Sequence, residues 1–194
     1  MTRIVAGIAG GRKLKVPPRG TRPTSERVRE AVFSSLHARI DFEGAAVLDL
    51  FAGSGALGLE ALSRGAERLV LVESDARAAG VARENISVVG LPGATVRCAP
   101  VASVLAGTAD TAFDLVLADP PYAVTEVAVA QILEALVSGG WLAPEAVVVL
   151  ERSARSPETS WPDGLSPEKV KKYGETRIEI AVFDDPSPGD SVQP

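Results

Sequence analysis

The residues of this chain best suited to chemistry follow its short apolar runs. Gly53, Gly55 and Gly58 form a G-x-G-x-x-G pattern between the run AAVLDL and the amphipathic stretch ALGLEALSRG. Glycines at a strand-to-helix turn let the backbone approach a ligand, and the helix that follows points its N–H groups at that ligand. The pattern predicts that a nucleoside-containing ligand binds at the carboxyl end of this strand.

Two acidic residues near these glycines narrow the choice of ligand. Glu73 ends the next apolar run, RLVLVE, where its carboxylate is placed to accept hydrogen bonds from ribose hydroxyls. Asp49 precedes the glycines and would repel a pyrophosphate, whereas it suits the cationic end of a methionine-like group. S-adenosylmethionine is therefore favoured over a dinucleotide as the cofactor. Phe51 is placed either to line this pocket or to pack in the core.

A third group, Asp119-Pro120-Pro121-Tyr122, follows the run FDLVLAD. An exocyclic amine of a nucleobase is a poor nucleophile until its hydrogens are held, because its lone pair is delocalised into the ring. The Asp119 carboxylate and the Pro120 carbonyl are acceptors for the two hydrogens, and Tyr122 can stack on a flipped base. The alternative is a proline-rich turn without chemistry, which the neighbouring cofactor residues disfavour. We expect a methyl acceptor site here.

The elements that must position these groups are predicted by hydrophobic patterning. Five buried strands alternate with amphipathic helices, which indicates a doubly wound, mostly parallel α/β sheet. The segment KVKKYGETRIEIAVF predicts a C-terminal antiparallel hairpin that turns near Gly174 at the sheet edge. Residues 152–168 are expected to be a loop, and residues 185–194 a disordered tail. The strands are expected at residues 45–50, 68–73, 94–98, 113–119 and 146–151.

Charge is unevenly distributed along the chain. Residues 1–39 hold nine Lys or Arg against two Glu, so this segment carries +7 in a protein whose net charge is −5. Such asymmetry indicates a basic arm that meets a polyanion, although a solvated charged face is the simpler alternative. A helix capped by Thr24 or Ser25 is predicted to run to about Ala38. The residues expected to contact this polyanion are Arg12, Lys13, Arg22, Thr24, Arg27 and Arg29.

Composition excludes several classes of protein. With 46% hydrophobic and 23% charged residues, the chain is neither disordered nor fibrous. One Cys and one His cannot build a disulfide or a zinc cluster, so no metal is expected and a reducing cytoplasm is the expected location. No apolar run reaches the length of a membrane span, so no membrane partner is expected. Cys98 is expected to be a small core residue, and His37 a structural or surface residue. Trp141 and Trp161 are left as core residues or anchors.

The chain resembles the RsmD family of bacterial methyltransferases, which modify a guanine of small-subunit ribosomal RNA at N2. The resemblance rests on RIVAGIAGGRKLKVP, RPTSERVREAVFSSL, DLFAGSGALGLEALSRGA, VESD, LADPPY and KKYGETRIEIAVF. It implies a Rossmann-like methyltransferase domain over residues 40–184 and an N-terminal extension over residues 1–39 that grips 16S ribosomal RNA within the 30S subunit or an assembly intermediate. It also implies a cofactor site that includes Asp49, Gly53, Gly55 and Glu73, and a base site of Asp119, Pro120 and Tyr122. Since Pro100 replaces a residue that is often polar in the family, the adenine contact is assigned to the backbone N–H of Val101. A monomer is expected.

Two other functions remain open from the residues alone. A DNA adenine or cytosine amino methyltransferase shares the DPPY motif, but nothing here resembles a large domain for reading duplex sequence. A non-catalytic RNA-binding factor for ribosome assembly would keep the fold without the reaction. The intact Asp119 and Tyr122 disfavour this second alternative.

Overall fold

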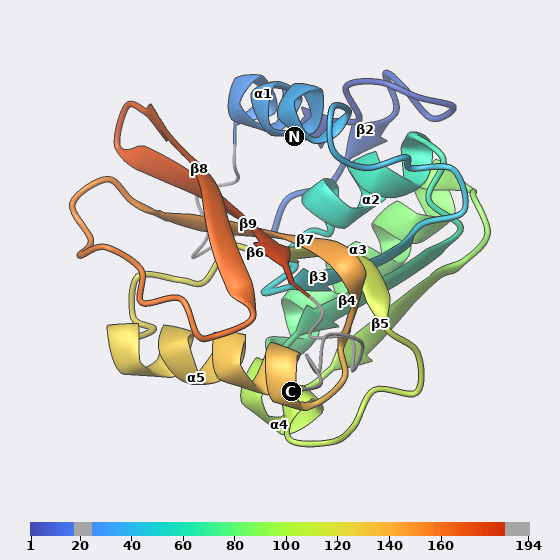
Figure 1. The fold of residues 1–194 in the computed structure, drawn as a ribbon. Coiled ribbons are helices and arrows are strands. Elements are labelled where there is room, and N and C mark those ends of the chain that lie inside the picture. The colour runs from blue at the N-terminus through green and yellow to red at the C-terminus, as the bar shows by residue number, and fades with distance from the viewer. Residues whose placement is uncertain (18–24, 185–194) are drawn as a thin grey trace, which may run out of the picture.

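A seven-stranded sheet lies between two groups of helices in the computed structural model, which describes residues 1–17 and 25–184 (Figure 1). The strand order is β5-β4-β3-β6-β7-β9-β8, in which β5 to β7 are parallel and β9 and β8 are antiparallel. The predicted Rossmann-like fold with its C-terminal hairpin is confirmed. The strands of the sheet are β3 (Ala46–Leu50), β4 (Arg68–Glu73), β5 (Ala94–Cys98), β6 (Phe113–Ala118), β7 (Leu142–Ser153), β8 (Leu165–Tyr173) and β9 (Thr176–Phe183).

Five helices in the described residues cover the sheet, and side chains at their first residues fix where three of them begin. Ser25 accepts a hydrogen bond from the Val28 N–H at 3.2 Å, and Asp75 and Thr125 accept equivalent bonds at 2.8 and 3.2 Å. These caps satisfy N–H groups that have no partner within a helix. The helices are α1 (Glu26–Leu36), α2 (Ala56–Ser63), α3 (Ala76–Val89), α4 (Val101–Leu105) and α5 (Glu126–Ser138).

Each face of the sheet has its own hydrophobic core. On one face α1, α2 and α3 bury residues such as Phe33, Leu59 and Ala82, and on the other α4 and α5 bury Leu105 and Leu133. Figure 1 shows α1 and α2 on one side of the sheet and α4 and α5 on the other. This two-sided cover explains why the central strands are almost continuously apolar.

The predicted loop over residues 152–168 is wrong at both of its ends. β7 continues to Ser153 and β8 begins at Leu165, so the connection is shorter. Pro167 hid the strand pattern, because proline cannot donate to a ladder of hydrogen bonds. It is accommodated because β8 lies at the sheet edge, where the pairing with β9 shifts register between Pro167 and Lys169. Helix α1 also ends slightly earlier than predicted, at Leu36.

The N-terminal segment is part of the same core as the methyltransferase fold. A small hairpin of β1 (Thr2–Arg3) and β2 (Lys13–Leu14) buries Ile4 and Leu14 completely. The turn of this hairpin rests on α2, where Ser63 Oγ accepts a hydrogen bond from the Ala9 N–H at 2.9 Å. The hairpin and α1 are therefore held against α2, the helix that follows the glycine-rich loop.

Candidate active site

A cavity of about 580 Å³ lies at the carboxyl edge of the sheet, where β3, β4, β6 and β7 end. This volume is within the range of small-molecule pockets, roughly 300–1,000 Å³. The cavity brings the DPPY motif together with four of the predicted cofactor residues, Asp49, Phe51, Gly53 and Glu73. Its lining includes Asp49, residues 51–54, Glu73, residues 119–122, Glu126, Glu151, Arg152 and residues 173–176.

The glycine-rich loop and Glu73 form one wall of the cavity. The Glu73 carboxylate accepts hydrogen bonds from the N–H groups of Gly53 and Asp75, both at 2.8 Å. Gly53 has a φ of +53°, and a Cβ added there would meet no atom within 4 Å. A side chain at this position would be strained and would project into open space. The loop therefore leaves room for a ligand beside an oriented carboxylate.

Asp49 contributes a second carboxylate to the cavity from the core side. It is 1% exposed and accepts a hydrogen bond from the Gly58 N–H at 2.9 Å. Burial raises the pKa of Asp49 to about 7, an effect that the Gly58 hydrogen bond opposes and the nearby Glu73 carboxylate reinforces. A buried carboxylate of this kind is stabilised by a cationic ligand group. This arrangement fits the charged amino acid portion of S-adenosylmethionine.

Three other residues of the predicted cofactor region lie in closely packed surroundings. Gly55 has a φ of +78° at the start of α2, and a Cβ there would lie 2.7 Å from Leu71. Gly58 allows α2 to approach β4, since its Cβ would lie 2.6 Å from Leu69. Val101 is buried at the start of α4, and its side chain packs in the core. Neither Gly55 nor Val101 is among the described residues that line the cavity.

The DPPY motif forms the opposite side of the cavity. Asp119 follows β6, Pro120 is buried, and Tyr122 is 80% exposed at the rim. An aromatic ring so exposed has a face accessible to a flat base, and stacking removes apolar surface of both rings from water. The chain then enters α5, whose Glu126 forms an ion pair with Arg152 of β7. This pair connects the segment that carries Tyr122 to the neighbouring strand.

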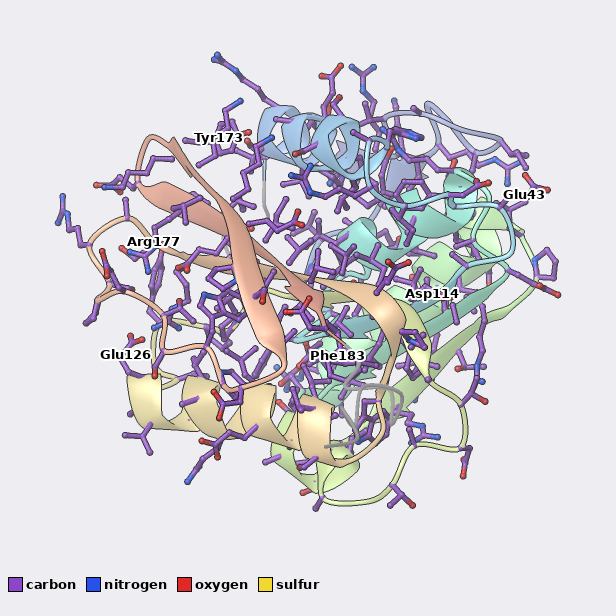
Figure 2. The ribbon with its side chains drawn as sticks, viewed as in Figure 1. Glu43, Asp114, Glu126, Tyr173, Arg177 and Phe183 are labelled. Carbon is purple, nitrogen blue, oxygen red and sulfur yellow. The ribbon has the colours of Figure 1, made fainter. Side chains whose placement is uncertain are left out.

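The β8–β9 hairpin and the connection before it close the cavity on its third side. Arg177 of β9 donates to the carbonyls of Ser156 and Pro157, both at 2.7 Å, and pairs with Glu179. These contacts hold the connection between β7 and β8 against the sheet. Figure 2 labels Arg177 and Tyr173 on the hairpin and Glu126 at the start of α5. Tyr173 and Glu126 line the cavity.

Arg29, expected to contact RNA, does not lie on an exposed face of α1, although it is among the residues that line the cavity. Its side chain is fully buried, where its guanidinium lies 3.4 Å from Glu60 and donates to the Arg3 carbonyl. Burial lowers the pKa of Arg29, and the nearby Glu60 carboxylate opposes that shift. The local sequence pattern did not reveal this burial, because the carboxylate that pairs with Arg29 belongs to Glu60 of α2, which is far away along the chain. Arg29 joins α1 to α2 instead of facing solvent.

The other predicted RNA residues differ in their surroundings. Arg12 is exposed overall, yet its guanidinium donates to the carbonyls of Val88 and Val89 at the end of α3. Lys13 and Arg27 are exposed. Arg22 and Thr24 lie outside the described residues, as does the predicted tail over residues 185–194. Val16, Ser25 and Val28 line the cavity, so the N-terminal segment reaches the site.

Two buried polar residues, which the sequence analysis missed, connect the basic N-terminal segment (residues 1–39) to the elements that carry the glycine-rich loop. This loop and Glu73 form the wall of the cavity that we call the cofactor wall. Asn85 of α3 is fully buried and donates to the carbonyls of Lys15 and Ser54, both at 2.9 Å. Glu60 of α2 accepts from the N–H groups of Val5 and Ala6 at 2.7 and 3.0 Å. Their partners are far away along the chain, so no local pattern reveals them.

Other sequence expectations concern residues away from the cavity. Cys98 is exposed at the end of β5, so its assignment to the core is wrong. His37 is exposed beside Arg64, and Trp141 is buried in the core. Among residues 1–17 and 25–184, no cluster of His, Cys, Asp and Glu side chains is arranged to hold a metal. No helix in the same residues is long and apolar enough to cross a membrane.

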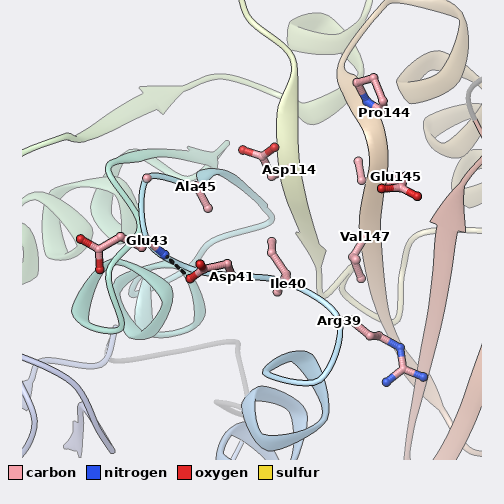
Figure 3. Close-up of a pocket in the computed structure, with 11 residues that line it drawn as sticks. Arg39, Ile40, Asp41, Glu43, Ala45, Asp114, Pro144, Glu145 and Val147 are labelled. Carbon is pink, nitrogen blue, oxygen red and sulfur yellow. Dashed lines mark hydrogen bonds between the residues drawn. The ribbon is translucent and has the colours of Figure 1, made fainter.

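A second, more open cavity of about 300 Å³ lies at the opposite edge of the sheet (Figure 3). Its carboxylates bind nearby backbone groups: Asp114 accepts from the Ala46 N–H at 2.8 Å, and Asp41 from the Glu43 N–H at 3.0 Å. Ligands of open α/β sheets bind at the carboxyl ends of the strands, so this amino-edge cavity is not the expected site.

The family follows from comparison with known proteins. A family model described as Conserved hypothetical protein 95 matches residues 2–182. The chain belongs to this family. The Ribosomal RNA small subunit methyltransferase D of Escherichia coli (strain K12) is 37% identical over 179 residues, which span 92% of this chain and 88% of that protein. A protein of the same name from Haemophilus influenzae is 32% identical and covers 80% of each chain. The resemblance to the RsmD family is confirmed.

Solved structures agree with this assignment. An Escherichia coli structure has a TM-score of 0.85 and 33% identity, and covers 94% of this chain and 98% of the other. The magnesium protoporphyrin IX methyltransferase of Synechocystis, solved with bound S-adenosylmethionine, has a TM-score of 0.63 and 17% identity over 81% of this chain and 79% of the other, a likeness of fold alone. S-adenosylmethionine is the cofactor that the RsmD family implies.

Proposed function

We propose that this protein transfers a methyl group from S-adenosylmethionine to the exocyclic N2 amine of a guanine in small-subunit ribosomal RNA. The observation that carries the proposal is the single cavity in which Gly53, Glu73 and Asp49 lie opposite Asp119 and Tyr122. Relatives at 37% and 32% identity are named as small-subunit ribosomal RNA methyltransferases, which supports the substrate class.

The cofactor wall has the donor and acceptor types that S-adenosylmethionine requires. Glu73 lies beside Gly53 and is placed to accept from ribose hydroxyls, while Asp49 faces the cavity from the buried side. When bound there, S-adenosylmethionine supplies an electrophilic methyl group. The residues of the chain have to hold it in place, exclude water and direct the acceptor nitrogen.

Asp119 and Pro120 direct the acceptor. The Asp119 carboxylate takes one amine hydrogen and the Pro120 carbonyl the other, which turns the nitrogen lone pair toward the methyl group. The methylated nitrogen is a strong acid, so a carboxylate is basic enough to receive its proton. Pro120 and Pro121 have no N–H groups and so present no competing donor. Tyr122 supplies the stacking surface, worth on the order of 1–3 kcal/mol.

The basic N-terminal segment supports RNA as the acceptor. Lys13 and Arg27 are exposed, and Val16, Ser25 and Val28 of the same segment line the cavity. Cations that contact phosphates near this opening would bring one nucleotide to Tyr122. The contacts with α2 and α3 keep the segment fixed relative to the cofactor wall.

The test is methyl transfer by the purified chain from labelled S-adenosylmethionine to 30S subunits from cells that lack the modification. Incorporation of label at a single guanine, mapped as N2-methylguanine in 16S ribosomal RNA, is expected. Free 16S ribosomal RNA, an assembly intermediate and duplex DNA are the parallel substrates. Transfer to an adenine or cytosine of DNA, or no transfer to any substrate, would refute the proposal.

A further inference from the structure

A second carboxylate lies beside Asp119 at the same edge of the sheet. Strands β6 and β7 are parallel, with Leu117 opposite Val149 and Ala118 opposite Leu150. The next positions in this register are Asp119 and Glu151. Leu117 and Val149 belong to the core on the α1–α3 side, so alternation places Asp119 and Glu151 on that same side. Neighbouring strands are about 4.8 Å apart, a spacing that one nucleobase can bridge.

Glu151 lines the same cavity as Asp119 and Tyr122. Arg152, the next residue, pairs with Glu126 at the start of α5 on the other side of the sheet. The strand that carries Glu151 is thereby tied to the helix that follows Tyr122. The strand register therefore places Glu151 next to the acceptor position, one strand further from the wall formed by the glycine-rich loop and Glu73.

The three nucleobases with exocyclic amines differ in the ring nitrogen next to the amine. The N2 amine of guanine lies between N1, which carries a hydrogen and is a donor, and N3, which is an acceptor, so only guanine offers a ring donor beside its amine. Beside the N6 amine of adenine, N1 is an acceptor, and beside the N4 amine of cytosine, N3 is an acceptor. An ionised carboxylate only accepts hydrogen bonds. A carboxylate at this position would attract guanine and repel the other two bases.

We propose that Glu151 selects guanine by accepting a hydrogen bond from N1–H while Asp119 and Pro120 hold the N2 amine. This inference rests on the proposed function and adds the residue that sets base specificity. Sequence reasoning noted that a strand ends at Glu151 but assigned the residue no role. Its position beside Asp119 became visible only with the pairing of β6 and β7.

The test compares guanine with 2-aminopurine at the mapped target nucleotide, in 30S subunits reconstituted from ligated 16S ribosomal RNA. 2-Aminopurine keeps the amine but has no hydrogen on N1. The wild-type enzyme is expected to prefer guanine by roughly 10- to 100-fold in kcat/KM. Glu151→Gln places an amide donor near N1 and should reduce this preference at least about tenfold. Because 2-aminopurine also lacks O6, the informative quantity is the change in preference between wild type and variant.

Control variants separate specificity from damage. Glu158→Gln, an exposed residue that does not line the cavity, should keep the wild-type preference and rate. Glu151→Asp, which keeps a carboxylate on a shorter side chain, should act more slowly yet still prefer guanine. Binding of S-adenosylmethionine, measured by calorimetry, should be the same in both Glu151 variants as in wild type.

The outcomes distinguish this inference from the proposed function. If wild type methylates the guanine and Glu151→Gln keeps the wild-type preference for guanine over 2-aminopurine, Glu151 does not read N1. The inference is then overturned, whatever the preference of Glu151→Asp, and the proposed function stands. If wild type methylates no guanine, the proposed function itself fails.

Discussion

The two edges of the sheet both carry carboxylates, but they use them differently. At the amino edge, Asp114 and Asp41 accept hydrogen bonds from backbone groups of β3 and of the turn before it. At the carboxyl edge, Asp49, Glu73 and Asp119 line a cavity enclosed by four strand ends. The difference shows that a strand-end carboxylate gains a functional role from the space beside it. Single substitutions of carboxylates at each edge test this difference.

The largest effect is expected at Asp119. Asp119→Ala removes the acceptor for an amine hydrogen and should lower kcat for methyl transfer by roughly 10²- to 10⁴-fold. Binding of S-adenosylmethionine should stay within about twofold, because the cofactor wall is on β3 and β4. Asp110→Ala, an exposed change before β6, is the matched control. Full activity in Asp119→Ala would favour a non-catalytic role for the protein.

A substitution at Glu73 tests whether the cofactor wall binds S-adenosylmethionine, and Glu67, just before the same strand, provides the control. Glu73→Gln replaces one acceptor oxygen by a donor that faces the Gly53 or Asp75 N–H. We expect the Kd for S-adenosylmethionine to rise roughly 10- to 100-fold, since a hydrogen bond to a charged group is lost. Glu67→Gln, just before β4 at the amino edge, should leave the Kd unchanged. Equal effects of the two changes would contradict the distinction between the edges.

Asp49 should make cofactor binding depend on pH. Since burial raises its pKa to about 7, the folded protein without cofactor holds a proton there at lower pH. A cationic ligand group must displace that proton, so affinity for S-adenosylmethionine should fall by up to about tenfold per pH unit below pH 7. Titration calorimetry from pH 5.5 to 8.5 measures this slope. Asp49→Asn should bind more weakly at pH 8 and show no such slope.

The same group predicts a stability effect of opposite sign. The folded protein keeps the Asp49 proton up to about pH 7, whereas the unfolded chain loses it near the ordinary value of 3.8. Stability from this group therefore decreases as the pH rises from about 4 to 7. At pH 8 Asp49→Asn should be more stable than wild type, by up to about 4 kcal/mol from the ionisation alone, and should have a higher Tm. Below about pH 4 this gain should vanish; a gain that is independent of pH would contradict the ionisation argument.

The smallest effect is expected at the amino edge. Asp114→Ala removes one hydrogen bond to the Ala46 N–H, at a cost of about 1 kcal/mol, or roughly 2–4 °C in Tm. Methyl transfer and the Kd for S-adenosylmethionine should be unchanged within error. Thermal melts and the transfer assay on the same preparation check both statements. A loss of cofactor binding would show that the amino edge also contributes to function.

The sequence by itself determined the fold class and the position of the cofactor loop. Alternating apolar runs and amphipathic stretches are local patterns, and a glycine-rich turn followed by a helix has few alternatives. The chemistry of Asp119, Pro120 and Tyr122 also follows from residue types at a strand end. These features depend on neighbours along the chain, so they are visible without coordinates.

Only the tertiary structure decided which charges are buried and which strand ends are adjacent. Arg29 looked like an exposed cation until Glu60 of α2 was found against it, and no local pattern pointed to Asn85, which lies buried between Lys15 and Ser54. Glu151 was assigned beside Asp119 by the pairing of β6 with β7. Each of these depends on segments far apart in sequence, whose contacts are fixed by how the whole chain buries its apolar surface.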